Sequence, residues 1–330
     1  MTRKIIALMM LLLFTLTACI NTESPPGSTS TGSNTASPPS SPTSEKLAFA
    51  KTIPVGNAKF QIYVMDINGI SQLRITNSAE GCSKPVWSPD GNKIAFVSRN
   101  QFQGDIYVTD VNGTEELRLT DNPAYDSNPS WSPDGAQILF TSDRDLNENN
   151  EAGATEIYVM NADGSNQTRL TFDEARKDDP RWSPDGSKVV YTSTISGQFE
   201  IYVMNIDGKE QIKLTDSQPG YSNFTPSWSP DGKKIVFEVV NSNDSNNTRH
   251  EICVINADGS DRIELIGYQS GPNLFPSWSP DGQKIIFVSG HDYPGQGITN
   301  LYTIDSDGSN LVRLTKDTTR VRYESPVWTK

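Results

Sequence analysis

Few side chains of this sequence have the types and spacing that catalysis needs. Each of the two histidines, His250 and His291, lies beside an acidic residue in an irregular segment of the chain. Two imidazoles cannot supply a three-histidine metal site. The sequence also lacks the Gly-x-Ser-x-Gly pattern of a hydrolase nucleophile turn. Repeated turns such as 305–309 contain several aspartates but lack the bidentate acid of a calcium loop. We therefore expect no catalytic residue, no metal site and no cofactor.

The three cysteines indicate covalent anchoring rather than redox chemistry. Cys19 ends the sequence Leu-Thr-Ala-Cys, which follows two basic residues and an apolar run at 5–16. That run is too short to span a bilayer and is typical of a signal peptide. Leu-Thr-Ala-Cys resembles the lipobox of bacterial lipoproteins. The resemblance implies removal of residues 1–18 and a diacylglycerol on Cys19. Cys82 and Cys253 are predicted to be buried free thiols.

The predicted location is outside the cytoplasm. An ordinary secretory signal with an incidental cysteine is the alternative to a lipoprotein signal, and both export the protein. With the lipid, the protein is held at the bacterial cell envelope, either at the outer membrane and periplasm or on the outer face of the cytoplasmic membrane. Residues 20–44 are nearly all Ser, Thr, Pro, Gly and Asn, with Glu23 as their one charged residue. Such a segment cannot build a core, so 19–44 is predicted to be a lipidated, disordered tether.

The side chains best suited to binding form short groups that mix aromatic, basic, acidic and amide types. The candidates are Tyr125, Asp126, Arg176, Lys177, Asp178, Tyr221, Asn223, Phe224, Asn273, Phe275, Arg322, Tyr323 and Glu324. Aromatic and arginine anchors among carboxylates suit a protein, peptide or glycan partner. The alternative for any one of them is that it solvates its loop or packs beneath it.

A repeat of 44 to 51 residues must position these groups. Trp-Ser-Pro-Asp-Gly occurs five times, at 87–91, 131–135, 182–186, 228–232 and 278–282. The sixth tryptophan, Trp328, follows Ser-Pro-Val near the end of the chain. Every tryptophan of the sequence therefore lies at one position of the repeat. A period of this length that is built from short strands is typical of a β-propeller blade.

Each period contains four strand-like segments. The first ends in tryptophan and enters a Pro-Asp-Gly turn, in which Gly supplies the positive φ. The second is an unbroken apolar run such as 94–97, which suits a strand buried on both faces. The third, for example 157–160, ends in an Asp-Gly turn. The fourth, such as 117–120, is polar enough for an outer edge strand.

The incomplete periods at the two ends predict how the ring closes. The folded part begins at 47–50 with a second strand, followed by third and fourth strands at 62–65 and 73–76. The chain ends at 326–328 with a first strand. Together they complete a sixth blade. We therefore predict one domain, 45–330, as an all-β, six-bladed β-propeller with ring closure between the N-terminal strands and the C-terminal tryptophan strand.

The order of the strands predicts which face binds. Antiparallel strands place the first-to-second and third-to-fourth turns on one face, and these are the uniform Asp-Gly turns. The second-to-third and blade-to-blade connections lie on the other face. They include the irregular segments 143–155, 240–250 and 289–299. Variable loops on a rigid scaffold are where binding residues gather, so the candidates above are expected around the channel mouth on this second face.

The charge of the chain excludes one class of partner. The formal net charge is −12, whereas a nucleic-acid binder normally carries a basic stripe that matches phosphate. Gly and Pro contents are close to average, which excludes collagen-like chains. We expect a monomer with no nucleic-acid partner.

The repeated pattern P-x-W-S-P-D-G, I-Y-V-M-N-x-D-G and R-L-T is similar to the TolB-type propeller repeat, in six copies over 45–330. The resemblance implies the propeller fold. TolB itself has an α/β domain before its propeller, where this sequence has the predicted tether. Because one fold supports many functions, the resemblance says far less about function. A role as an envelope scaffold of the Tol–Pal kind is implied by the resemblance alone.

The predicted function is a non-catalytic binding or scaffold module at the cell envelope, with its partner at the channel mouth and its lipid in the membrane. The alternative is an enzyme that processes glycans or cell-wall fragments with channel carboxylates such as Asp126, Asp178 and Glu324. Such an enzyme needs a carboxylate pair about 5–10 Å apart.

Overall fold

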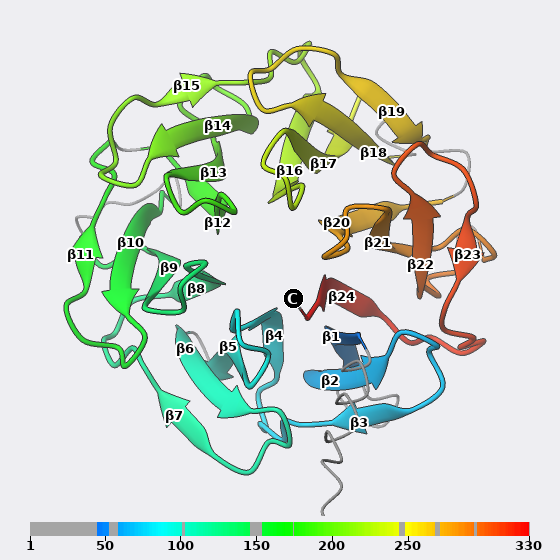
Figure 1. Cartoon of the computed structure of the whole chain (residues 1–330), viewed down its shortest axis with the longest axis horizontal. Helices are drawn as coiled ribbons and strands as arrows, with labels where there is room; N and C mark the ends of the chain where they lie inside the picture. The colour runs from blue at the N-terminus through cyan, green and yellow to red at the C-terminus, as the bar shows by residue number, and fades with distance from the viewer. Residues whose placement is uncertain are drawn as a thin grey trace, which may run out of the picture. The chain divides into compact units, whose positions relative to one another are not determined.

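The folded part of the chain is built from antiparallel strands arranged around a central axis (Figure 1). The computed structural model describes residues 45–52, 59–100, 103–145, 154–173, 175–243, 248–267, 271–293 and 296–329. These residues form six four-stranded sheets. The predicted six-bladed propeller is thereby confirmed. The predicted signal peptide, Cys19 and the tether lie outside the described residues.

An inner strand lines the axis in each blade and ends in tryptophan. These strands are β4 (Cys82–Trp87), β8 (Asp126–Trp131), β12 (Lys177–Trp182), β16 (Tyr221–Trp228), β20 (Asn273–Trp278) and β24 (Tyr323–Trp328). Five of them run into a Ser-Pro-Asp-Gly turn. In the first such turn the Ser88 hydroxyl donates to the Asp90 carboxylate at 2.5 Å and accepts the Lys93 amide at 2.9 Å. The same two contacts recur in the other four turns.

The second and third strands of each blade form its buried middle. The second strands are β1 (Lys46–Thr52), β5 (Lys93–Asn100), β9 (Gln137–Ser142), β13 (Lys188–Ser193), β17 (Lys234–Asn241) and β21 (Lys284–Ser289). The third strands are β2 (Phe60–Asp66), β6 (Gln103–Asp110), β10 (Glu156–Asn161), β14 (Glu200–Asn205), β18 (Arg249–Asn256) and β22 (Asn300–Asp305). Blades are numbered 1 to 6 in the order of their second strands. In β5, all four residues from Ile94 to Val97 are 0% exposed, which confirms the prediction of strands buried on both faces.

The fourth strands are short outer edges, as predicted. They are β3 (Gln72–Arg74), β7 (Glu116–Arg118), β11 (Thr168–Arg169), β15 (Ile212–Lys213), β19 (Ile263–Ile266) and β23 (Val312–Arg313). In five of the six blades, a threonine two places after the last residue of the fourth strand fixes the edge. The Thr120 hydroxyl, for example, accepts the Ile106 amide of β6 at 3.0 Å. Four other blades repeat this bond, whereas in blade 5 the corresponding residue is Ile266.

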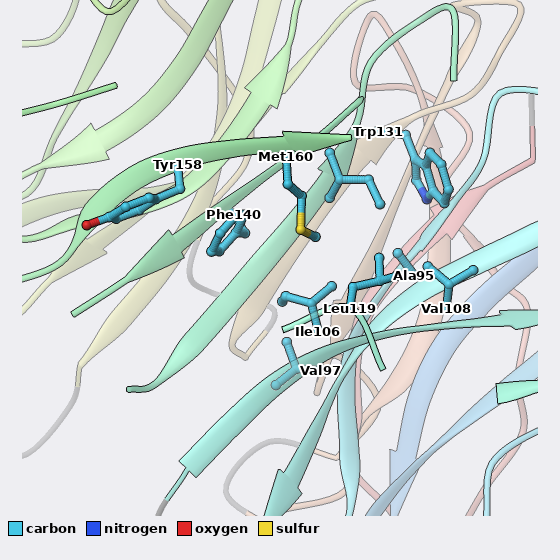
Figure 2. Packing of buried hydrophobic residues seen from close by; sticks show 10 residues of the cluster. Ala95, Val97, Ile106, Val108, Leu119, Trp131, Phe140, Tyr158 and Met160 are labelled. Atoms are coloured by element: carbon cyan, nitrogen blue, oxygen red, sulfur yellow. The ribbon is translucent and has the colours of Figure 1, made fainter. Parts of the chain in front are cut away.

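The hydrophobic core lies between neighbouring blades. Between blades 2 and 3, Ala95 and Val108 of one sheet and Trp131 and Met160 of the next belong to one buried cluster (Figure 2). A cluster of this kind fills each of the six interfaces among the described residues. Because each tryptophan packs on the preceding blade, the repeat spacing keeps the inner strands in one layer around the axis.

The ring closes where the sequence predicted. The last strand, β24, pairs with β1 through Leu47 opposite Trp328 and Lys51 opposite Tyr323. The Thr329 amide donates to the Lys46 carbonyl at 2.9 Å. Blade 1 is therefore assembled from both ends of the described chain.

Two further observations concern the described residues. Cys82 and Cys253 are buried and free, as predicted. No helix among the described residues is long and apolar enough to cross a membrane.

Candidate functional site

The two faces of the propeller differ as predicted. The Ser-Pro-Asp-Gly turns and the Asp-Gly turns after the third strands lie on one face, which we call the turn face. The connections between second and third strands, and those between blades, lie on the opposite face, which we call the loop face. Each inner strand begins at the loop face, so its first residues surround the mouth of the channel.

A ring of six unusual backbone positions lies below that mouth. In every inner strand the residue before proline, three places before the tryptophan, has a positive φ of 48–55°. We call these residues the pre-proline ring: Lys84, Asn128, Asp179, Thr225, Phe275 and Ser325. The pairing register with the next strand shifts at this point in all six blades. Such a bulge redirects a side chain out of the regular alternation.

The pre-proline ring stores backbone strain. An L-residue with positive φ costs roughly 1–2 kcal/mol, and a following proline restricts the backbone further. Strain of this size is kept only where the surrounding structure imposes it, and it is common at ligand sites. The proline and tryptophan of the motif are constant, yet the six ring residues are of six different types. The ring therefore presents a varied set of side chains on a repeated frame.

A pocket of about 560 Å³ opens above this ring at the loop face. We call it the mouth pocket. Its lining includes Tyr125, Arg176, Asp178, Phe224, Glu238 and His250, together with five members of the pre-proline ring, Lys84, Asn128, Asp179, Thr225 and Phe275. These residues come from five of the six blades. The volume falls within the range of about 300–1,000 Å³ that is typical of ligand pockets.

An ion pair across the channel forms the floor of the mouth pocket. The Lys84 ammonium lies 2.9 Å from the Asp179 carboxylate, although the two residues are two blades apart. Lys84 Nζ also lies 5.8 Å from the centre of the Phe275 ring, on a third alternate blade. Beneath them is a cavity of about 30 Å³, which Arg181 and Ser325 help to line. Three alternate blades thus meet at one layer.

The charges of the floor stabilise each other. Burial acts against the charge on Lys84, but the Asp179 carboxylate more than compensates and keeps the pKa of Lys84 above its ordinary value. Burial also acts against the Asp179 carboxylate, yet Lys84 and Arg181 hold its pKa below the usual range. Arg181 has its pKa lowered by burial. Removal of either partner would leave a poorly solvated charge.

The walls of the mouth pocket carry one more ion pair and a contact between a carboxylate and an imidazole. Arg176 Nε donates to Asp178 at 2.7 Å. Burial raises the pKa of Asp178, and the neighbouring Asp179 carboxylate raises it further. On the opposite wall, Glu238 lies 2.8 Å from His250 Nδ1 and accepts the Phe275 amide at 3.3 Å. The sequence placed His250 in an irregular segment beside Glu251. It instead lies in β18 and pairs with Glu238.

Five of the thirteen predicted binding residues line the mouth pocket. They are Tyr125, Arg176, Asp178, Phe224 and Phe275. Three more do not contribute to its lining: Tyr221 accepts a hydrogen bond from Asn241 at 2.8 Å, Arg322 is exposed, and Glu324 is half-buried opposite Ala50. Of the three carboxylates proposed for an enzyme, only Asp178 is therefore among the residues of the pocket.

The remaining five candidates are buried, at 0–2% exposure, and bond within the propeller. Their partners are Arg144 for Asp126, Glu156 for Lys177, Glu200 for Asn223, Ser289 for Asn273 and Asp317 for Tyr323. All five lie five places before the tryptophan of their strand, as does the buried Cys82. Because side chains alternate along a strand, this position faces the neighbouring sheet, and the next residue faces the mouth. In this structure the five are not available to a partner.

Sequence reasoning missed Lys84, Asp179, Glu238 and His250. Lys84 and Asp179 carried a usable signal, because they occupy the most variable place within the repeated x-Pro-x-Trp, where all six residues differ. The Glu238–His250 pair had no such signal, since it joins two strands across a hairpin. Among the described residues, no group of three or more histidine, cysteine, aspartate or glutamate side chains is placed to hold a metal ion.

Comparisons with solved structures reproduce the fold. TolB from Acinetobacter baumannii superposes with a TM-score of 0.71 at 25% identity, over 86% of this chain and 66% of that one. The putative TolB from Agrobacterium tumefaciens gives 0.52 at 26% identity, over 72% of this chain and 96% of that one. Hydrazine synthase of Kuenenia stuttgartiensis, at 16% identity and a TM-score of 0.67, shares the fold alone.

Comparisons with sequences add the family. The Tol-Pal system protein TolB of Blochmanniella pennsylvanica is 36% identical over 53 residues, which are 16% of this chain and 12% of that protein. The Tol-Pal system protein TolB of Histophilus somni strain 129Pt has the same identity and coverage, 36% over 53 residues. The matches thus span about an eighth of these relatives' length. The model of the TolB beta propeller domain matches residues 28–149 and 146–330. With this match over most of its length, the chain belongs to the family of TolB beta-propeller domains.

Proposed function

We propose that the propeller is a non-catalytic binding module that holds a protein or peptide partner in the mouth pocket. The observation that carries the proposal is the pre-proline ring. Six strained positions present six different side chains beneath a pocket of about 560 Å³. A purely structural repeat has no need of such variation at a strained position that recurs in every blade.

The chemistry of the pocket walls supports a macromolecular partner. Tyr125 and Arg176 are of the residue types that contribute most energy at protein interfaces, Phe224 is of an aromatic type enriched there, and all three line the same pocket. Phe224 is backed by Phe199, whose ring centre lies 4.7 Å away, and Arg176 lies over the ring of Phe199 at 5.6 Å. These contacts pre-organise the side chains, which lowers the entropy cost of binding.

The enzyme alternative has less support. The Asp126 carboxylate is 0% exposed and accepts two hydrogen bonds from the Arg144 guanidinium, both at 3.0 Å. It is thus committed to a structural ion pair, and of the three proposed carboxylates only Asp178 lines the mouth pocket. Of the carboxylates that do line the mouth pocket, Asp178 and Asp179 each have a cationic partner within 2.9 Å, and Glu238 lies 2.8 Å from His250 Nδ1.

The partner is proposed to lie at the cell envelope. The apolar run at 5–16 and the sequence Leu-Thr-Ala-Cys ending at Cys19 support export and lipidation. A diacylglycerol supplies two acyl chains, and two chains are enough for stable membrane anchoring. The relatives named as Tol-Pal system proteins are consistent with work in the envelope, although they match only 53 residues.

Replacing Cys19 with serine is expected to release the protein from the membrane fraction. The wild-type protein should incorporate an alkyne-labelled fatty acid, and the variant should not. Cys253→Ser is the matched control, because its buried thiol has no part in lipidation and its label and fractionation should equal those of the wild type. Membrane retention of unlabelled Cys19→Ser protein would contradict the lipid anchor.

A triple variant of the mouth pocket tests the binding function. The combined change of Tyr125, Arg176 and Phe224 to alanine is expected to abolish recovery of partners captured from detergent-solubilised envelopes, while leaving the melting temperature within a few degrees. The control variant changes three other residues to alanine, namely Ile70, Leu117 and Lys209. These residues are exposed and lie away from the mouth. Equal partner recovery by both triple variants would exclude the mouth pocket as the binding site.

A further inference from the structure

The mouth pocket contains a hydrogen-bond acceptor that nothing in the described structure satisfies. Asn128 is 4% exposed and lines the pocket. Its Nδ2 group donates to the Thr141 hydroxyl at 3.2 Å and to Asp178 Oδ1 at 3.3 Å. Among the described residues, its Oδ1 has no partner, and neither does the Thr225 hydroxyl across the pocket. An unsatisfied buried polar group costs roughly 1–3 kcal/mol, so the Asn128 oxygen favours a ligand that donates, whereas the Thr225 hydroxyl can donate or accept.

Carboxylates outnumber the lysine and arginine side chains in the lining of the mouth pocket, with Asp178, Asp179 and Glu238 against Lys84 and Arg176. Asp178 lies directly beside Asn128, and burial together with the Asp179 carboxylate raises its pKa. Glu324 occupies the same register position in blade 1, four places before the tryptophan. Burial raises its pKa as well. A carboxylate in this condition is stabilised by any cation that approaches it.

The cations of the pocket are already engaged. Lys84 is paired with Asp179 at 2.9 Å and Arg176 with Asp178 at 2.7 Å. An anionic ligand would have to break one of these pairs. The carboxylate that lost its partner would then face the negative charge of the ligand. A cationic ligand breaks none of these pairs, so the electrostatic preference of the pocket is for positive charge.

The aromatic walls suit the remainder of such a ligand. Tyr125, Phe224 and Phe275 line the pocket together with Asn128 and Asp178. Aromatic faces attract ammonium and guanidinium groups, and they also pack against the methylene stems of lysine and arginine. The net charge of −12 adds long-range attraction for a basic partner.

We propose that the mouth pocket seats a lysine or arginine side chain of the partner, with its cationic group between Asn128 Oδ1 and the Asp178 carboxylate. The aromatic walls hold the alkyl stem of that side chain. This inference rests on the proposed binding function and defines the chemistry that the partner presents.

A random heptapeptide library displayed on phage, selected against the immobilised full-length protein, is the probe. Selected peptides are expected to share a lysine or arginine at one position. One selected peptide is then synthesised with lysine or Nε-acetyllysine at that position, and both affinities are measured by calorimetry. Acetylation removes the charge but keeps the stem, and it is expected to weaken binding at least tenfold.

Two isosteric variants test the assigned atoms in opposite directions. Asp178→Asn removes a charge and is expected to weaken binding of the lysine peptide about tenfold. Asn128→Asp adds a charge, keeps a residue type that tolerates positive φ, and is expected to tighten binding about threefold. Asp121→Asn makes the same charge change at an 85% exposed site on the outer edge and should have no effect.

The outcomes separate the inference from the proposed function. If peptides bind and lose affinity with Tyr125→Ala or Phe224→Ala, but bind equally with lysine and acetyllysine, the cation site is wrong and the mouth remains the binding site. Selection of acidic residues at the shared position would likewise overturn the cation site. If no selected peptide depends on the mouth residues, both proposals fail.

Discussion

Replacing Lys177 with methionine is expected to lower the free energy of unfolding by about 3–5 kcal/mol. The ammonium of Lys177 is 0% exposed and lies 3.2 Å from the equally buried carboxylate of Glu156. It also contacts the Asp173 carboxylate and donates to the Ala175 carbonyl at 3.0 Å. Methionine fills similar space but leaves Glu156 with Arg169 as its remaining cation, at 2.9 Å. Chemical denaturation followed by tryptophan fluorescence measures the loss.

The pH dependence of this loss identifies its cause. Burial already raises the pKa of Glu156 in the folded protein, and loss of Lys177 raises it further. The folded variant therefore keeps a proton at pH values where the unfolded chain has lost it. Its stability falls as the pH rises through this window, so the deficit relative to wild type should be smaller at pH 5 than at pH 8.

Two variants accompany the Lys177 measurement. Lys209→Met makes the same change at a 78% exposed lysine and is expected to cost less than about 0.5 kcal/mol. Adding Glu156→Gln to Lys177→Met should recover part of the stability, because the buried charge is then removed with its partner. An unchanged free energy of unfolding in Lys177→Met would show that the buried ion pair is not formed.

Deleting residues 321–330 is expected to abolish the folded monomer. The deletion removes β24, exposes the edge of β1, and takes the buried side chains Tyr323 and Trp328 out of the cluster between blades 1 and 6. Losing one such aromatic side chain lowers the free energy of unfolding by about 3–5 kcal/mol. The loss of both side chains approaches the total free energy of unfolding of a typical domain, about 5–15 kcal/mol. Circular dichroism and size-exclusion chromatography measure the outcome.

Complementation distinguishes loss of closure from nonspecific damage. A synthetic peptide of residues 321–330, added to the truncated chain, should restore the β-sheet signal and a monomeric elution volume. The same peptide with Trp328→Ala and Tyr323→Ala should not. A truncated chain that melts with the wild-type transition would contradict the role of β24 in closing the ring.

The fold was predictable because its determinants are local and repeated. Trp-Ser-Pro-Asp-Gly encodes a turn whose hydroxyl and carboxylate contacts span only six residues, as Ser88, Asp90 and Lys93 show. The apolar runs define the buried middle strands. The two incomplete periods leave one consistent way to close the ring, and the pairing of Leu47 with Trp328 follows it.

The site was only partly predictable, and the alternation of side chains explains most of the difference. Asp126 and Lys177 were grouped with their neighbours as binding residues. Counting back from the tryptophan separates them, because position −5 faces the next sheet and position −4, as in Asp178, faces the mouth. The bulge before proline then turns Asn128 and Asp179 to the pocket. This rule is contained in the sequence but requires the strand register.

The pairs that define the electrostatics of the site were beyond sequence reasoning. Lys84 and Asp179 are 95 residues apart and meet across the channel. His250 and Glu238 meet across one hairpin, but only because β17 and β18 extend to Asn241 and Arg249. Such contacts depend on the diameter of the closed ring and on loop lengths, which no local pattern specifies.

Photo-crosslinking in living cells tests most directly whether the mouth pocket is the binding site. A benzophenone amino acid placed at position 125, within the pocket, is predicted to form a covalent adduct with an envelope protein. The same group at position 70, which is 81% exposed on the turn face, is predicted to form none. Adducts from position 70 but not from position 125 would contradict the assignment of the binding site to the mouth pocket.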